Sequence, residues 1–252
     1  MFSVISVLAI GYALLCLLLF ALQRQMIYFP TPETSVPGVA HIVLDRGDVR
    51  IKVWTLNPGK SRALLYFGGN AEQVAANIDS FKTLFADRTV YLLNYRGYGG
   101  SSGTPDEAGL YSDALLAYDH FSKFHRETAV MGRSIGSAVA TYVAAKRPVK
   151  RLLLITPFDR AISVASKLYP IFPMGVLLRD RYDSLDRACD INAETLIVAA
   201  EEDGIIPRQS TERLANALKQ QTQLQVAWLR EVDHNSVHLH PAYAKVIAEF
   251  MR

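Results

Sequence analysis

The fold is decided by residues 128–138, which read TAVMGRSIGSA. A short apolar run, residues 128–131, leads directly into the pattern Gly-x-Ser-x-Gly centred on Ser134. Small residues follow the serine, as a helix requires when it packs closely against the strand before it. A turn of this kind holds the serine in a strained backbone conformation with its hydroxyl accessible. The segment therefore predicts a strand, a sharp turn that carries a nucleophilic serine, and a helix.

The same pattern occurs a second time at residues 99–103, which read GGSSG and are centred on Ser101. This copy lies in a glycine-rich loop and is followed closely by Pro105, so no helix can begin at the serine. We interpret Ser101 as part of a flexible turn and Ser134 as the nucleophile. The glycines also miss the Gly-x-Gly-x-x-Gly spacing and no Walker lysine follows them, which argues against a phosphate-binding loop.

Strand-like and helix-like segments alternate on both sides of the serine turn. The expected strands are residues 39–44, 49–56, 63–67, 90–93, 129–131, 152–155, 196–200 and 224–229. Between several of them, apolar residues recur at helical spacing, as Leu110, Ala114 and Tyr118 do. This alternation is typical of an α/β fold: a doubly wound, mostly parallel sheet with helices on both faces. In such sheets the active site lies at the carboxyl ends of the strands, where Ser134 is expected.

The acid of a serine-histidine-acid triad is expected after the serine and before the histidine. Asp203 occupies a turn directly after the strand at 196–200. Its carboxylate would accept the imidazole Nδ1–H and hold the required tautomer. Glu201 and Glu202 in the same turn are the alternative acids, which we interpret as solvated turn residues.

The histidine of the triad is expected near the carboxyl edge of the sheet. His234 lies there, in the loop between the strand at 224–229 and the last helix, and we predict that it is the general base. His238 and His240 raise the alternative of a zinc site. No carboxylate with ligand spacing accompanies them, and a zinc site would leave Ser134 unexplained. We therefore expect neither a metal nor a cofactor.

An oxyanion hole requires two preorganised N–H donors. We expect the first to be the amide of Ile135, at the start of the helix where the helix dipole favours negative charge. The second should come from the loop after the third strand, residues 66–71, with the amide of Asn70 as the donor. An alternative interpretation has Asn70 capping the next helix, and the two roles are compatible.

The N-terminal segment carries no charged side chain from residue 1 to 22. As a helix it would span roughly 32 Å, against about 30 Å of bilayer hydrocarbon. It lacks the basic start and the Ala-x-Ala-like site of a cleaved signal peptide. We expect a single-pass transmembrane anchor over residues 1–24, a juxtamembrane segment at 25–37 and one domain at 38–252. Arg24 alone leaves the side of the membrane open.

Composition narrows the possible functions. The net charge is +3 and Lys and Arg form no long run, so the chain lacks the basic footprint of a nucleic-acid-binding protein. Cys16 and Cys189 are the only cysteines, and Cys16 lies inside the apolar N-terminal segment. Neither a disulfide framework nor a cysteine-based zinc site can be built from them.

Taken together, these residues resemble the α/β-hydrolase superfamily, specifically small N-terminally anchored hydrolases related to lysophospholipid lipases and protein depalmitoylases. That group is also placed with prolyl-oligopeptidase-like serine peptidases. The resemblance runs from about Gln25 to the C-terminus. It rests on residues 27–30 (IYFP), 94–99 (NYRGYG), 103–110 (GxPxExGL), 132–137 (GRSIGS) and 203–207 (DxxxP). These motifs are specific for the fold and the triad, and much less so for the substrate.

The chain departs from the family pattern in one place. The family usually carries His-Gly-Asn-Ala-Gly after the third strand, whereas this chain reads GGNAE at residues 68–72. The histidine is lost and a carboxylate, Glu72, is gained. This puts the donor geometry and the rate in question, but not the reaction class.

The substrate is indicated only by residues 157–190, where this plan inserts a lid. The segment is apolar and interrupted by Pro170 and Pro173. An apolar lid near a bilayer suits an acyl chain, so we expect an ester or thioester of a lipid or acylated substrate. The alternatives are that the segment merely covers the sheet, that the protein is a peptidase, or that it is a non-catalytic scaffold. The oligomeric state is left open.

Overall fold

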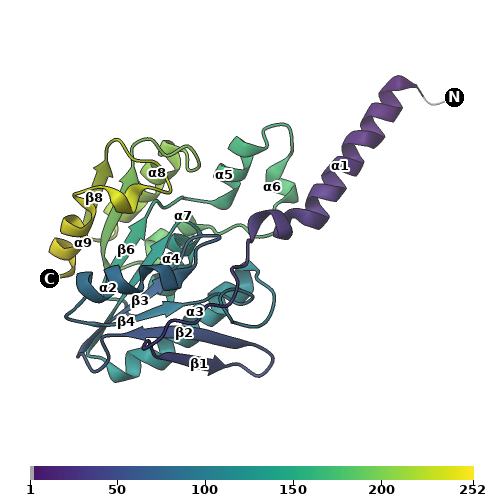
Figure 1. The fold of residues 1–252 in the computed structure, drawn as a ribbon. Coiled ribbons are helices and arrows are strands. Elements are labelled where there is room, and N and C mark those ends of the chain that lie inside the picture. Colours follow the sequence, from purple (N-terminus) through teal and green to yellow (C-terminus); the bar gives the residue numbers. More distant parts are fainter. Residues whose placement is uncertain (1–2) are drawn as a thin grey trace.

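A mixed sheet of eight strands forms the centre of the molecule (Figure 1). The computed structural model describes residues 3–252. The strands are β1 (His41–Asp45), β2 (Arg50–Leu56), β3 (Arg62–Phe67), β4 (Thr89–Leu93), β5 (Glu127–Arg133), β6 (Arg151–Ile155), β7 (Glu194–Ala200) and β8 (Leu224–Leu229). Their spatial order is β1-β2-β4-β3-β5-β6-β7-β8. The first two pairings are antiparallel and the others parallel, which confirms the expected fold. Each expected strand is present, with its ends within two residues of the prediction.

Helices cover both faces of the sheet. They are α1 (Val4–Ile27), α2 (Ile78–Leu84), α3 (Glu107–Phe121), α4 (Ile135–Lys146), α5 (Ala161–Leu168), α6 (Met174–Leu177), α7 (Ser184–Arg187), α8 (Arg208–Lys219) and α9 (Tyr243–Met251). Residues of α3, α4 and α8 pack on one face, and residues of α2 and α9 pack on the other. The split follows from the alternation of side chains along a strand: in β3, Leu65 belongs to the first core and Leu64 to the second.

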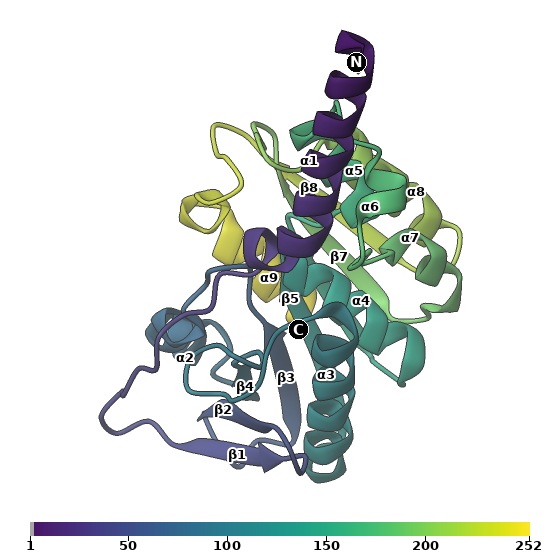
Figure 2. The same cartoon turned by 90° about the vertical axis from the view of Figure 1, so that its right-hand side faces the viewer.

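Helix α1 rises from the body beside α5 and α6 (Figures 1 and 2). It is long and apolar enough to cross a membrane, and most of its side chains are exposed. The helix continues to Ile27, three residues beyond the expected end of the anchor. The extended chain that follows is fixed to the body, because Gly99 N–H donates to Thr31 O (2.9 Å) and Lys52 Nζ pairs with Glu33 (3.0 Å). The base of α1 is therefore held directly over the carboxyl edge of the sheet.

Candidate active site

Ser134 occupies the turn between β5 and α4. Its backbone has φ 52° and ψ −120°, a strained conformation for a residue other than glycine that costs about 1–3 kcal/mol. A side chain at Gly132 would collide with the backbone of Gly136, and one at Gly136 would collide with the carbonyl of Phe67. Strand and helix therefore nearly touch on either side of the serine, as the small residues around it predict.

The three residues predicted for a triad lie in one hydrogen-bonded chain. His234 Nε2 is 2.9 Å from Ser134 Oγ, and its Nδ1 is 2.8 Å from Asp203 Oδ2. A carboxylate only accepts hydrogen bonds, so Nδ1 donates and Nε2 is free to accept from the serine hydroxyl. His234 is 5% exposed. The arrangement can deprotonate the serine hydroxyl in a site largely shielded from water.

Asp203 is oriented by its own turn. Its Oδ1 accepts hydrogen bonds from the amides of Ile205 (2.9 Å) and Ile206 (2.7 Å), which leaves Oδ2 for the imidazole. The alternative acids are exposed, and Glu201 lies 3.6 Å from the exposed Arg230. Of the three acids in this turn, Asp203 is therefore the one that the structure brings to His234.

The two predicted oxyanion donors line one cavity with Ser134. Ile135 is the first residue of α4, and Asn70 lies in the turn after β3. Within residues 3–252, no hydrogen bond uses the backbone N–H of Asn70, so it is free to donate. Its side chain does not cap a helix, so that alternative is wrong: the next helical turn begins at Val74 and has Gln73 at its N-cap.

The Asn70 side chain instead joins the base of α1 to the body. Its Oδ1 accepts from the amide of Phe29 (3.1 Å) and from the hydroxyl of Tyr98 (2.9 Å). Its Nδ2 donates to the carbonyl of Ile27. The loop that carries a predicted oxyanion donor is thereby tied to the last turn of α1.

Glu72, the residue that departs from the family pattern, is a half-buried hydrogen-bonding centre. Its carboxylate accepts from Tyr66 Oη (2.6 Å), from the amide of Gly69 (2.7 Å) and from Asn77 Nδ2 (2.7 Å). It also pairs with Arg133 at 3.0 Å. Burial raises the pKa of Tyr66, and the neighbouring carboxylate of Glu72 adds to the effect, so the phenol stays a neutral donor.

The Glu72–Arg133 pair links the loops around Ser134. Arg133 directly precedes the serine, and its Nη2 lies 3.4 Å from the carbonyl of His234. A Cβ at Gly68 would lie 2.6 Å from Val74 Cγ1, closer than side chains pack. The family histidine at 68 thus has no room here. The contacts of Glu72 with Tyr66, Gly69 and Arg133 were not predicted from the sequence, which raised Glu72 only as a question about the donor geometry.

The other sequence candidates lie outside this arrangement. Ser101 Oγ donates to Asn94 O (2.9 Å) and accepts from Lys52 N (2.9 Å), so its turn is fixed, not flexible as expected. His238 is exposed. Among residues 3–252, no three His, Cys, Asp or Glu side chains gather as metal ligands would.

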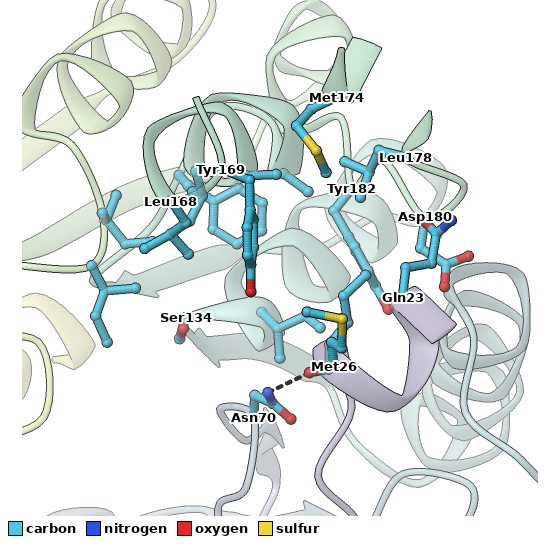
Figure 3. A pocket seen from close by; sticks show the side chains of 18 of the residues that line it. Gln23, Met26, Asn70, Ser134, Leu168, Tyr169, Met174, Leu178, Asp180 and Tyr182 are labelled. Atoms are coloured by element: carbon cyan, nitrogen blue, oxygen red, sulfur yellow. Dashed lines mark hydrogen bonds between the residues drawn. The ribbon is translucent and has the colours of Figure 1, made fainter. Parts of the chain in front are cut away.

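An apolar cavity of about 230 Å³ opens at Ser134 (Figure 3). Much of its wall comes from α1 and from the segment that carries α5 and α6. The lining residues include Leu19, Gln23 and Met26 of α1, Val164 and Leu168 of α5, and Met174 of α6. Among the described lining residues, Asp180 is the only charged one. Its carboxylate accepts hydrogen bonds from Arg24 and Tyr28. The cavity thus presents an uncharged, hydrophobic surface next to the serine.

Comparison with known proteins finds relatives that match most of the chain. A protein of Mycobacterium tuberculosis described as uncharacterized is 32% identical over 229 residues, covering 85% of this chain and 82% of the relative. An uncharacterized membrane protein of Saccharomyces cerevisiae is 25% identical, covering 88% and 82%. Alpha/beta hydrolase domain-containing protein 17B of Homo sapiens is 26% identical, covering 77% and 68%. No protein-family model matches the chain.

Solved structures show the same fold at low sequence identity. The esterase Pf2001 of Pyrococcus furiosus superposes with a TM-score of 0.71 at 12% identity, covering 88% of this chain and 98% of that structure. A thioesterase domain from the curacin biosynthetic pathway superposes with a TM-score of 0.63 at 16% identity, covering 86% and 100%. Both superpositions cover most of this chain and nearly all of the other.

Proposed function

Because this chain belongs to the α/β-hydrolase superfamily, we propose that it is a membrane-anchored serine hydrolase that cleaves a lipid ester or thioester. The observation that carries the proposal is the unbroken chain from Ser134 Oγ through His234 to Asp203, at the mouth of an apolar cavity. Esterase and thioesterase names among the similar structures support the same reaction class.

The proposed reaction proceeds through an acyl-enzyme. His234 Nε2 takes the proton of the Ser134 hydroxyl as Oγ attacks the carbonyl carbon. The resulting oxyanion accepts hydrogen bonds from the backbone amides of Ile135 and Asn70. The tetrahedral intermediate collapses, and His234 returns the proton to the departing alcohol or thiol. Water then attacks the acyl-enzyme with His234 as the base again, which releases the acid and restores the serine.

The cavity favours an acyl chain over a peptide. A peptidase that recognises a substrate amine would need a free acidic group, and Asp180 is already paired with Arg24 at 2.9 Å. The hydrophobic walls suit methylene groups, which gain about 0.8 kcal/mol each on burial. An ester or thioester with an apolar acyl group is therefore the proposed substrate.

The test combines a covalent probe with a substrate panel. A fluorophosphonate should label the wild-type protein and the Ser101→Ala variant, and should leave Ser134→Ala unlabelled. Turnover of p-nitrophenyl esters and acyl thioesters should fall by roughly six orders of magnitude in Ser134→Ala. Labelling of Ser134→Ala at the wild-type rate, or preferential turnover of a peptide amide, would refute the proposal.

Helix α1 is proposed to be a transmembrane anchor for the hydrolase domain. A helix of 24 residues is about 36 Å long, enough to cross the hydrocarbon layer. The similarity to a yeast membrane protein supports this assignment. Full-length protein should sediment with membranes after a high-salt wash and dissolve in detergent. Recovery in the high-salt supernatant would contradict the anchor.

A further inference from the structure

We infer that helix α1 is also part of the substrate site, and that the acyl chain passes from the bilayer to Ser134 between α1 and the lid. The inference rests on the proposed hydrolase function and deepens it, because it assigns the substrate to lipids that remain in the membrane. The lid is the segment 157–190, which carries α5, α6 and α7.

One face of α1 forms a wall of the cavity. Leu19, Gln23 and Ile27 follow one another at helical spacing and all line it. Their neighbours Leu18 and Leu22 are 54% and 37% exposed and are not among the residues that line it. In Figure 3, Met26 and Gln23 of α1 lie across the cavity from Leu168 and Tyr169 of the lid. The apolar helix therefore has one face toward the substrate and another toward lipid.

Polar side chains lock this wall to the lid. Gln23 is buried inside the apolar helix, and its amide donates to Leu177 O (3.0 Å) and accepts from Arg179 N (2.8 Å). A buried amide in an apolar setting is costly unless it is fully hydrogen-bonded. Here two of its three partners, Leu177 and Arg179, belong to the lid, and the third is the carbonyl of Phe20 in α1. One turn later, Tyr28 donates to Asp180 (3.0 Å). The helix and the lid thus form one structural unit.

The tip of the lid reaches along α1 to the depth of the bilayer. Tyr12 donates to the carbonyl of Ile171 (2.7 Å), and its ring stacks on Phe172 at 6.0 Å. Tyr12 lies twelve residues before Arg24, which is about 18 Å along a straight helix. One leaflet contributes about 15 Å of hydrocarbon, so a residue this far from Arg24 lies at the depth of the acyl chains. The lid side chains Ile171 and Val176 are 71% and 80% exposed, so they would contact acyl chains and not water.

The size of the cavity explains why it must open to the lipid. Its 230 Å³ is below the range of about 300–1,000 Å³ that encloses a drug-sized ligand. It can therefore hold only the carbonyl end of a long acyl chain, and the remainder must continue along the wall of α1. An open end between exposed apolar residues would be unfavourable in water and is favourable inside a leaflet.

The experiment uses full-length protein in phosphatidylcholine vesicles and two fluorophosphonates, one with an ethyl chain and one with a hexadecyl chain. Both label the serine by displacing fluoride, so their rates report access to Ser134 whatever the natural leaving group. Leu19→Trp places a larger side chain on the wall of α1 and narrows the passage between α1 and the lid. The matched control is Leu18→Trp, which makes the same change one position away on the exposed face.

We expect Leu19→Trp to slow labelling by the hexadecyl probe about tenfold or more, as overpacking of a filled groove would, and to change the ethyl probe less than about twofold. Leu19→Phe, a smaller increase, should give a smaller loss in the same direction. Leu18→Trp should leave both rates near those of the wild type. Equal slowing of the hexadecyl probe by Leu18→Trp, or equal slowing of both probes by Leu19→Trp and Leu19→Phe, would overturn the inference. Failure of the wild type to react with either probe would instead refute the hydrolase function.

Discussion

The catalytic edge of the sheet and the anchor–lid unit, which consists of α1 and the lid, are held in place by different forces. Ser134 is positioned mainly by backbone elements, because β5 and α4 lie on either side of it and nine of the twelve residues of α4 are buried. By contrast, Gln23 is the one buried residue of the described α1, and α5 has none. Side-chain hydrogen bonds connect the two parts of the anchor–lid unit. The proposed reactive geometry thus belongs to the core, whereas the proposed selection of acyl chains depends on side-chain contacts between α1 and the lid.

The largest effect should come from the triad acid. Asp203→Asn retains the shape but offers an amide that favours the wrong imidazole tautomer, so turnover should drop about ten-thousandfold. Short and long acyl esters should suffer equally, because the change lies at the catalytic edge. Glu201→Gln and Glu202→Gln in the same turn are the matched controls, and each should change turnover less than about tenfold. A loss in Glu202→Gln as large as that in Asp203→Asn would mean that the acid is misassigned.

The next effect should come from Glu72, whose carboxylate holds the loop at residues 66–71 that carries the oxyanion donor Asn70. Glu72→Gln keeps the size but weakens hydrogen bonds to a charged acceptor, each contributing about 1.5–3 kcal/mol. We expect kcat for a butyrate ester to fall about ten- to hundredfold, with KM nearly unchanged. The control is Glu33→Gln, which removes an exposed carboxylate paired with Lys52. A wild-type kcat in Glu72→Gln would show that the loop at residues 66–71 keeps its geometry without the Glu72 carboxylate.

A smaller effect, of a different kind, should follow from disrupting the anchor–lid unit. Asp180→Ala removes the acceptor of Arg24 and Tyr28, and should lower the free energy of unfolding by about 1–3 kcal/mol. The hexadecyl fluorophosphonate should react more slowly while the ethyl probe is little affected. Asp180→Asn, which keeps an acceptor, should lie between this variant and the wild type. If Asp180→Ala slowed both probes alike, the two regions would not be separable in the way described above.

The smallest effect should appear as a pH dependence at the base of the lid. Burial alone would raise the pKa of Asp159, but hydrogen bonds from Arg213 and Ser210 outweigh it and hold the pKa below its ordinary value. A lowered folded-state pKa stabilises the protein above the unfolded value of about 3.9, and this stabilisation is lost as the pH falls through the folded value. Asp159→Asn should therefore be about 1 kcal/mol less stable than the wild type at pH 7, and the gap should close under acid. Urea titrations at pH 7 and pH 3 measure it, and a gap that does not change with pH would contradict the assignment.

Much of the architecture could be predicted from local pattern. Short apolar runs and helical spacing specified the sheet, and the turn chemistry around Ser134 required the small residues found at Gly132 and Gly136. Chain order then placed Asp203 and His234 in loops after β7 and β8, where they meet the serine. These features were predictable because each depends on neighbours within a few residues, or on a topology that periodicity alone implies.

The sequence by itself therefore determined the sheet, the sharp serine turn and the order of the candidate triad. Only the tertiary structure decided that Glu72 braces Arg133, 61 residues away, and that Tyr12 of the apolar helix meets Ile171, 159 residues away. Local propensity encodes strands, helices and turns through short-range sterics and periodic burial. A contact between distant segments depends on how whole elements pack, and it leaves no periodic trace in a single chain. For that reason an N-terminal segment that reads as a simple anchor also forms a wall beside Ser134.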